Sequence, residues 1–205
     1  MKASIFVGAS VDGFIARRNH TFDFLDAGGN EPHGFEEFMA SVDALVMGRK
    51  TYDVVRVFDT WPYGDKPVFV LSTRKLAPAP QGVVVERLSG PPGRIVSRLE
   101  ARGFRHLYVD GGLTIQRFLR AGLIQRLTVT RVPTLIGSGI PLFGPLQGDI
   151  RLRHVATRSY TGGLVQSEYD VLPSAKRRRV SEASTPDRRA SRGARARSTR
   201  RPRRR

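Results

Sequence analysis

The chain has 205 residues, a mass of 22.8 kDa and a formal net charge of +17. This length suits one domain with a sizeable core, so a small disulfide or metal scaffold is unnecessary. The absence of cysteine excludes disulfides, thiolate metal sites and cysteine nucleophiles. No apolar run approaches the roughly 18 residues of a membrane helix, and residues 1–7 are too short an apolar start for a secretory leader. We therefore expect a cytoplasmic protein with no membrane partner.

The positive charge is concentrated at the C-terminal end. Residues 173–205 hold 14 of the 35 basic residues and 2 of the 18 acidic ones, a net charge of +12, which leaves +5 for residues 1–172. This tail contains no aromatic residue, and Val180 is its only large aliphatic one. A segment of this kind buries too little apolar surface to offset the entropy of ordering. We expect a folded domain over residues 1–172 and a disordered arginine-rich tail over 173–205.

Short β-rich runs alternate with segments of helical period, which predicts an α/β domain. Eight strands are expected, at residues 4–9, 44–47, 68–71, 82–86, 106–109, 126–132, 151–160 and 164–171. The early runs are short and apolar, as in parallel strands that are buried on both faces. The last two are joined by Thr161-Gly162-Gly163, which is typical of a hairpin turn. The sheet is thus expected to be parallel early and antiparallel at its end.

Helices are expected between these strands. An apolar stripe at helical spacing predicts the first one, and it comprises Phe35, Phe38, Met39 and Val42. Ile95, Leu99 and Ala101 mark a second helix, and residues 113–119 form a third. The proline- and glycine-rich residues 90–93 are expected to form a loop.

Two strand-to-helix junctions combine glycines with hydrogen-bond donors. The first contains Gly48, Arg49, Lys50 and Thr51; the second contains Gly111, Gly112, Leu113 and Thr114. Such junctions favour anions, because unpaired N–H groups point outward from a helix start. Neither matches G-x-G-x-x-G or a Walker A loop, and each alone is also typical of an ordinary capped strand exit.

Two further segments could contact a ligand. Ser72, Thr73, Arg74 and Lys75 follow a strand with two hydroxyls and two cations, which suits a phosphomonoester; a solvated surface loop is the alternative. Residues 133–143 place Gly137 and Gly139 between apolar anchors, which suits a close-approach loop, although an ordinary inter-strand loop has the same pattern.

Five motifs in one order are more specific than any one of them. They are residues 10–16 (Ser-Val-Asp-Gly-Phe-Ile-Ala), 47–52 (Met-Gly-Arg-Lys-Thr-Tyr), 71–74 (Leu-Ser-Thr-Arg), 110–112 (Asp-Gly-Gly) and 137–143 (Gly-Ser-Gly-Ile-Pro-Leu-Phe). In this order they resemble the dihydrofolate reductase-like superfamily, most closely its branch shared with the C-terminal domain of the riboflavin-biosynthesis pyrimidine reductase. The resemblance covers residues 2–172. It implies a mixed, mainly parallel sheet of about eight strands flanked by helices, NADPH as cofactor, and a homodimer.

The resemblance also implies roles for individual residues. Contacts to the cofactor phosphates would come from Gly48, Arg49, Lys50 and Thr51, and contacts to the pyrophosphate from Gly111, Gly112, Leu113 and Thr114. The adenosine 2′-phosphate would lie near Ser72, Thr73 and Arg74. The nicotinamide and substrate side would be formed by Val11, Asp12, Gly13 and Ile15, with Ile136 and Gly137 closing over the ring. Asp12 is the candidate catalytic acid, although an aspartate before glycine is also favourable turn chemistry.

The implied activity is reduction of a small heteroaromatic or imine-type substrate, as in 5-amino-6-(5-phosphoribosylamino)uracil reductase. Folate reduction is not expected, because no carboxylate stands near Pro32, where the pterin-binding acid of those enzymes would lie. Glu36 and Glu37 are instead expected on a solvated helix face. The four histidines are scattered, so no metal site is expected. His33 could donate a proton or simply lie on the surface.

Two other interpretations remain for the tail. Its 13 arginines could bind nucleic acid or another polyanion without sequence preference and with a steep salt dependence. It has no aromatic residues that could stack on bases. Alternatively, its composition matches a read-through or shifted-frame extension of a GC-rich gene, with no selected function.

Overall fold

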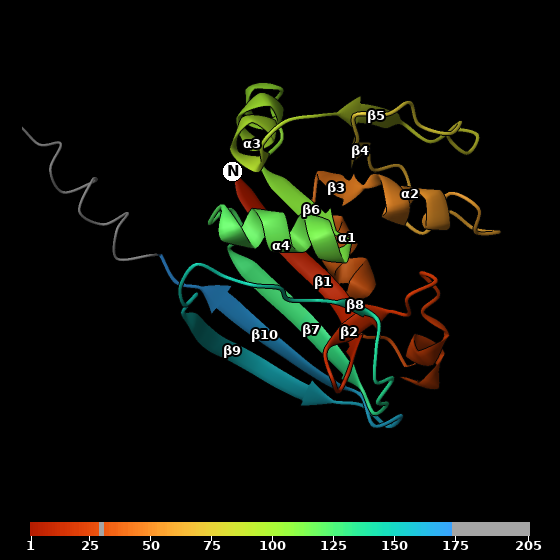
Figure 1. The fold of residues 1–205 in the computed structure, drawn as a ribbon, viewed down its shortest axis with the longest axis vertical. Coiled ribbons are helices and arrows are strands. Elements are labelled where there is room, and N and C mark those ends of the chain that lie inside the picture. Colours follow the sequence, from red (N-terminus) through yellow and green to blue (C-terminus); the bar gives the residue numbers. More distant parts are fainter. Residues whose placement is uncertain (29–30, 174–205) are drawn as a thin grey trace, which may run out of the picture. The chain divides into compact units, whose positions relative to one another are not determined.

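A computed structural model describes residues 1–28 and 31–173 of the chain, and Figure 1 shows its elements. The expected disorder of the tail, from residue 174 onward, and its expected polyanion contacts lie outside the described residues. Among the residues described, no helix has both the length and the apolar character needed to cross a membrane.

The described chain contains ten strands and four α-helices, with one 3₁₀ helix (Asp23–Gly28). The strands are β1 Lys2–Ser10, β2 Phe14–Ala16, β3 Ala44–Gly48, β4 Val68–Leu71, β5 Val85–Leu88, β6 His106–Asp110, β7 Arg126–Val132, β8 Ile140–Pro141, β9 Leu152–Ser159 and β10 Val165–Val171. The helices are α1 Phe35–Ser41, α2 Arg49–Val55, α3 Pro92–Ala101 and α4 Gly112–Arg120.

Eight strands form one sheet in the order β5-β4-β3-β6-β1-β7-β10-β9. The first six in this order are parallel neighbours, whereas β10 is antiparallel to both β7 and β9. The predicted mixed, mainly parallel sheet is therefore confirmed. The predicted hairpin turn is also present, because the N–H of Tyr160 donates to the carbonyl of Leu164 at 3.0 Å.

Each strand directs alternate side chains to opposite faces of the sheet, and each face has its own helices. Ile5 and Val46 pack with Ile95 of α3 and with Ile115 and Phe118 of α4. On the opposite face, the core contains Leu45, Met47, Val68 and Val70 of the sheet together with Tyr52 and Val55 of α2. Partly buried residues of α1, Phe35, Phe38 and Met39, pack against this second core, as their helical spacing predicts.

Three predicted boundaries are wrong. Val42, expected on the first helix, follows α1 with extended backbone (φ −106°, ψ 150°) and is buried in the second core. The strand predicted at 82–86 lies at Val85–Leu88, because pairing with β4 sets its register and places Leu88 in the core; Gly82 instead has a φ of 76° in a turn. The loop predicted at 90–93 overlaps α3, which starts at Pro92. Proline is favourable there, since its fixed φ suits the first helical turn and its missing N–H needs no partner.

A short two-stranded sheet that the alternation analysis did not predict joins β2 and β8. Ala16 pairs with Ile140 and Phe14 with Pro141, and the N–H of Leu142 donates to the carbonyl of Gly13 at 2.9 Å. The motif at residues 10–16 is thereby bound to the glycine-rich loop at 137–143, although more than 120 residues separate them.

Candidate cofactor and substrate site

The carboxyl ends of the parallel strands bring the predicted turns to one edge of the sheet. In the register of the sheet, Met47 pairs with Asp110 and Gly48 pairs with Leu71, so the turns that follow β3, β4 and β6 lie beside one another. This edge is where open α/β sheets bind their ligands. The structure thus brings three of the predicted turns together, and their joint contact with a cofactor stays a prediction.

The starts of α2 and α4 approach each other closely, and glycine is what permits the approach. A Cβ atom at Gly48 would lie 3.1 Å from the Thr114 hydroxyl, and one at Gly111 would overlap the Thr51 hydroxyl. Gly111 also has a φ of 86°, a conformation that favours glycine. No side chain caps either helix start. The backbone of both turns and two threonine hydroxyls therefore gather at one place.

Gly112 is also needed for packing within the chain, and its contact with a pyrophosphate stays a prediction. A Cβ atom there would lie 3.1 Å from Ile140 Cγ2 and from the carbonyl oxygen of Pro141, and 3.3 Å from Ile15 Cδ1. The glycine thus allows β2 and β8 to pack on the start of α4. Leu113, the next residue, is exposed.

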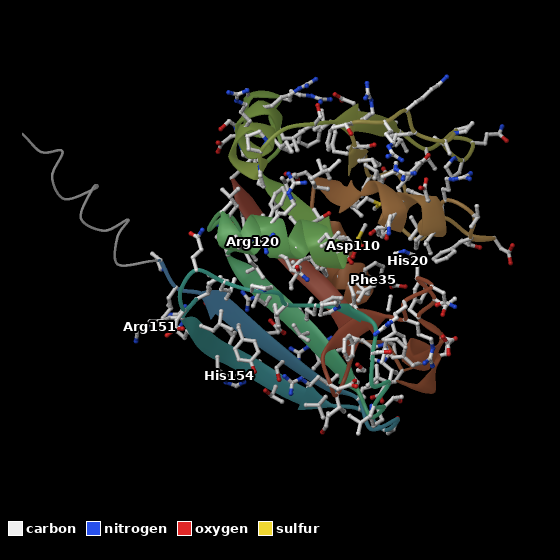
Figure 2. All side chains as sticks on the ribbon, in the orientation of Figure 1. His20, Phe35, Asp110, Arg120, Arg151 and His154 are labelled. Carbon is white, nitrogen blue, oxygen red and sulfur yellow. The ribbon has the colours of Figure 1, made fainter. Side chains whose placement is uncertain are left out.

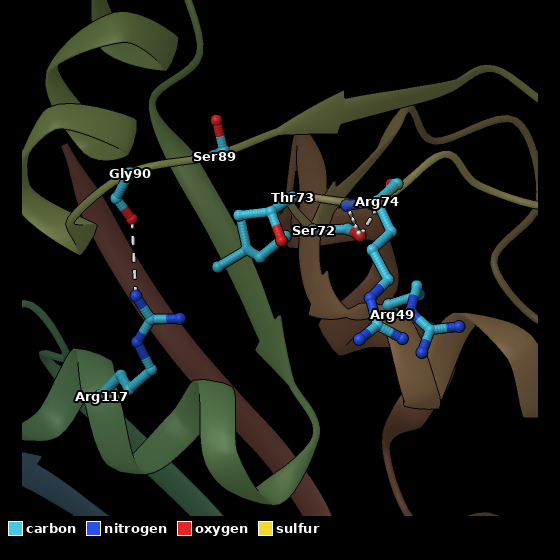
Figure 3. A pocket seen from close by; sticks show the side chains of 8 residues that line it. Arg49, Ser72, Thr73, Arg74, Ser89, Gly90 and Arg117 are labelled. Carbon is cyan, nitrogen blue, oxygen red and sulfur yellow. Dashed lines mark hydrogen bonds between the residues drawn. The ribbon is translucent and has the colours of Figure 1, made fainter.

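An open pocket of about 320 Å³ lies at the ends of β4 and β5 (Figure 3). It is lined by Arg49, Leu71, Ser72, Thr73, Arg74, Ser89, Gly90 and Arg117. The lining includes three arginines and no carboxylate. The Ser72 hydroxyl donates to the carbonyl of Arg74 at 2.8 Å and accepts the Arg74 N–H at 3.0 Å, which shapes the turn after β4. We call this cavity the arginine pocket.

The three arginines differ in their partners. Arg49 donates to Asp53 at 2.8 Å, and Arg117 reaches from α4 to the carbonyl of Gly90 at a long 3.5 Å, as Figure 3 shows. The exposed Arg74 guanidinium has no hydrogen-bond or ion-pair partner among the described residues. The pocket therefore offers one cation without a partner and one held by a long contact, both available to an anionic ligand.

The sequence analysis missed Ser89, Gly90 and Arg117 as pocket residues. Arg117 stands three residues after Thr114, so both lie on one face of α4, and that helical spacing was the available signal. Ser89 and Gly90 follow β5, and the misplaced strand prediction concealed them. Lys50 lies elsewhere: its ammonium is 3.4 Å from His20 Nε2.

Asp12 holds the loop that the resemblance places over the nicotinamide. Its carboxylate accepts the N–H of Gly137 at 2.7 Å and that of Ile136 at 3.3 Å. A hydrogen bond from Ser10 lowers the pKa of Asp12, opposed by desolvation, and these two backbone N–H groups lower it further. The side chain is therefore an ionised acceptor at neutral pH, which gives it a positioning role; its catalytic role stays a prediction.

A different carboxyl, Asp110, has its pKa shifted in the opposite direction. It ends β6 and precedes the Gly111 turn, and Figure 2 labels it near the start of α4. Its Oδ1 accepts the N–H of Gly111 at 2.7 Å, and its Oδ2 accepts the Tyr63 hydroxyl at 3.0 Å. Burial raises the pKa of Asp110, and the two hydrogen bonds oppose that shift without cancelling it. In the sequence, Asp110 is recognisable only as part of the motif at residues 110–112, which predicts no role for its carboxyl.

The histidines do not assemble into a metal site. Within the described ranges, no group of three or more histidine, aspartate or glutamate side chains is placed to hold a metal ion. His33 is partly buried and packs edge-on against Tyr160, with 4.9 Å between ring centroids. His106 lies at the opposite edge of the sheet from the turns, where its Nδ1–H donates to the carbonyl of Ser41 and its Nε2 contacts the Ser4 hydroxyl, each at 2.8 Å.

The fold and this edge define a class of protein. The arrangement is the dihydrofolate reductase-like fold, and a dihydrofolate reductase from Enterococcus faecalis, complexed with NADP(H), superimposes with a TM-score of 0.58. The superposition covers 84% of this chain and 97% of that one, at 15% identity, so it shows the fold alone.

Within that class, the chain belongs to the RibD C-terminal domain family, whose model matches residues 2–166. A putative riboflavin biosynthesis protein from Shewanella sp. PV-4 is 40% identical, with a TM-score of 0.78 over 84% of this chain and all of that one. The uncharacterized protein YwjB of Bacillus subtilis (strain 168) is 29% identical over 171 residues, which are 82% of this chain and 97% of YwjB. The predicted family is therefore confirmed, and the chain carries a domain of a reductase family.

Proposed function

We propose that the chain is an NADPH-dependent reductase that acts on a small heteroaromatic or imine-type substrate. The arginine pocket is the observation that carries the proposal, because it lies beside the two glycine turns at the carboxyl edge of the sheet. Family membership supports an oxidoreductase. The pocket supports the choice of NADPH over NADH, since only NADPH carries a phosphate on the adenosine ribose.

The residues of the edge fit NADPH in three places. The arginine pocket would hold the 2′-phosphate, with Arg74 and Arg117 as cations and Ser72 and Thr73 as hydroxyl donors. The glycine turns would hold the pyrophosphate, because their backbone approaches closely and their helix starts carry free N–H groups. The nicotinamide would lie toward the paired segments that contain residues 11–15 and 136–137.

The bound cofactor would supply the hydride, and the chain's own residues supply position, shielding and a proton. Asp12 holds the backbone of Ile136 and Gly137, which fixes the loop that would close over the nicotinamide. Burial raises the pKa of Asp110, so this carboxyl would keep a proton to a higher pH than an exposed carboxyl does. Its two hydrogen bonds use one lone pair on each oxygen, which leaves the remaining lone pairs able to hold that proton.

Calorimetric titration of the full chain with NADPH and then NADH tests the proposal. We expect saturable binding of NADPH that is at least about tenfold tighter than binding of NADH, since a charge-assisted phosphate contact contributes about 1.5 to 3 kcal/mol. Titrations at about 0.15 M salt screen nonspecific contacts with basic segments. Equal affinities, or no saturable binding, would contradict the proposal. A homodimer stays a prediction, which sedimentation equilibrium would test.

A further inference from the structure

A second cavity, of about 310 Å³, lies between α1 and the segment that leads into β4. Its lining consists of Phe35, Glu36, Met39, Ala40, Pro62, Tyr63, Gly64, Asp65 and Lys66. Five of these residues are apolar or aromatic and come from both sides of the cavity. Its volume is near the lower end of the range for small-molecule sites, so it suits a ring-sized group. We call it the aromatic pocket.

This pocket is connected to the candidate cofactor site through one hydrogen-bonded pair. Tyr63 lines the cavity, is 5% exposed, and donates its hydroxyl to Asp110 at 3.0 Å. Asp110 in turn accepts the N–H of Gly111, the first residue of the pyrophosphate turn. Tyr63 therefore links a group bound in the aromatic pocket to the carboxyl of Asp110, which the proposed function uses.

The two pockets have opposite charge. The arginine pocket contains three guanidinium groups and no carboxylate, whereas the aromatic pocket contains Glu36, Asp65 and Lys66. Within the part of the chain that the structure describes, neither Glu36 nor Asp65 forms an ion pair, and both are exposed at the cavity rim. One lysine against two carboxylates leaves an excess of negative charge. Such a rim repels a phosphate and attracts an ammonium group.

We propose that the aromatic pocket binds the non-reacting part of the substrate, and that this part is an apolar ring that is either uncharged or carries an amine, without a phosphate. This inference rests on the proposed function, because it takes the ligand of this pocket to be the substrate of the reductase. It separates this chain from a reductase of phosphoribosyl pyrimidines, because the phosphate of such a substrate would meet two lining carboxylates here against one lining cation, Lys66. Discrimination comes from apolar contact with Phe35 and Met39 and from the carboxylates at the rim.

The single tryptophan reports on this pocket. Trp61 packs edge-on against Tyr63, with 5.2 Å between ring centroids, and is absent from the lining of the arginine pocket. Fluorescence titrations of the full chain without cofactor would use 2-phenylethylamine, 2-phenylethanol and 2-phenylethyl phosphate, which share one ring and differ in charge. We expect saturable changes in fluorescence, with the highest affinity for the amine and an affinity at least about tenfold lower for the phosphate. Each of the two exposed carboxylates, Glu36 and Asp65, should change the affinity a few-fold.

Two pairs of variants assign the binding to this cavity. Ala40→Leu inserts a larger side chain at an exposed, lining position and should weaken the amine at least about tenfold, whereas Ala101→Leu, at an exposed position on α3, should leave it unchanged. Asp65→Lys should reduce or reverse the preference for the amine over the phosphate, whereas Asp149→Lys, the same charge change at an exposed site outside the cavity lining, should not.

Equal affinity for the amine and the phosphate, or wild-type binding by Ala40→Leu, would overturn the inference. The outcome is separable from the fate of the proposed function, because NADPH is absent from these titrations. If NADPH binds and none of the probes does, the reductase proposal stands and this inference is wrong. If the probes bind in the expected order and NADPH does not bind, the ligand class stands and the reductase proposal is wrong.

Discussion

Replacing Arg74 by alanine tests the arginine pocket at its most accessible cation. The guanidinium has no hydrogen-bond or ion-pair partner among the residues that the structure describes, so its removal should leave the fold unchanged. The turn itself depends on the Ser72 hydroxyl and the Arg74 backbone, which the substitution keeps. The whole effect should therefore fall on the ligand. A charge-assisted contact to a phosphate contributes about 1.5 to 3 kcal/mol, and we take the lower value because the side chain is exposed.

That value corresponds to about a tenfold loss of NADPH affinity, with NADH affinity nearly unchanged. Calorimetric titration of the wild type and the variant with both cofactors measures how much the affinity for NADPH and the affinity for NADH change. Lys75→Ala is the matched control, since it removes a neighbouring exposed cation that does not line the pocket. Arg74→Lys should have an NADPH affinity between those of the wild type and Arg74→Ala, because an ammonium keeps the charge without the bidentate geometry. Equal losses for NADPH and NADH, or an equal loss from Lys75→Ala, would refute the reasoning.

Three further predictions concern Asp12, His106 and the position of Pro32. Asp12→Ala should accelerate amide hydrogen exchange at Gly137 and weaken NADPH binding, and unchanged exchange there would contradict the positioning role. Burial lowers the pKa of His106, so as the pH falls below 6.5 this imidazole takes up a proton in the unfolded chain before it does so in the folded one. The free energy of unfolding should therefore decrease in that range, as measured by denaturant titrations. His106→Gln should remove that part of the decrease. Purified protein should not turn over dihydrofolate with NADPH, because the exposed Pro32 provides no carboxylate for a pterin, and efficient turnover would show this to be wrong.

The sheet could be predicted because its strands carry their own signal. Residues 68–71 and 126–132 are strands with the predicted bounds, and α1 starts at Phe35, where the apolar stripe begins. Period and composition are local properties, so one sequence displays them. Register is not local: residues 82–86 have the composition of a strand, yet pairing with Val68 and Leu71 selects Val85–Leu88.

The turns of the candidate site could be predicted from the sequence, whereas the contacts that these turns make with distant segments could not. Glycine turns after strands are visible in sequence, whereas the contact of Gly111 with Thr51, or of Gly112 with Ile15 and Ile140, joins distant segments. The pKa shifts of Asp12 and Asp110 have the same origin. Both are aspartates before glycine, and only the folded chain surrounds one with N–H donors and buries the other.

The 2′-phosphate of bound NADP⁺ gives the most direct test of the central claim, through its ³¹P NMR titration. A free phosphomonoester has a second pKa of about 6, and guanidinium groups favour its dianion. We expect the pKa of this phosphate to fall when NADP⁺ binds the full chain and to return toward the free value in Arg74→Ala. A 2′-phosphate that titrates identically in free and bound NADP⁺ would lie outside the arginine pocket, which would contradict the proposed binding of NADPH there.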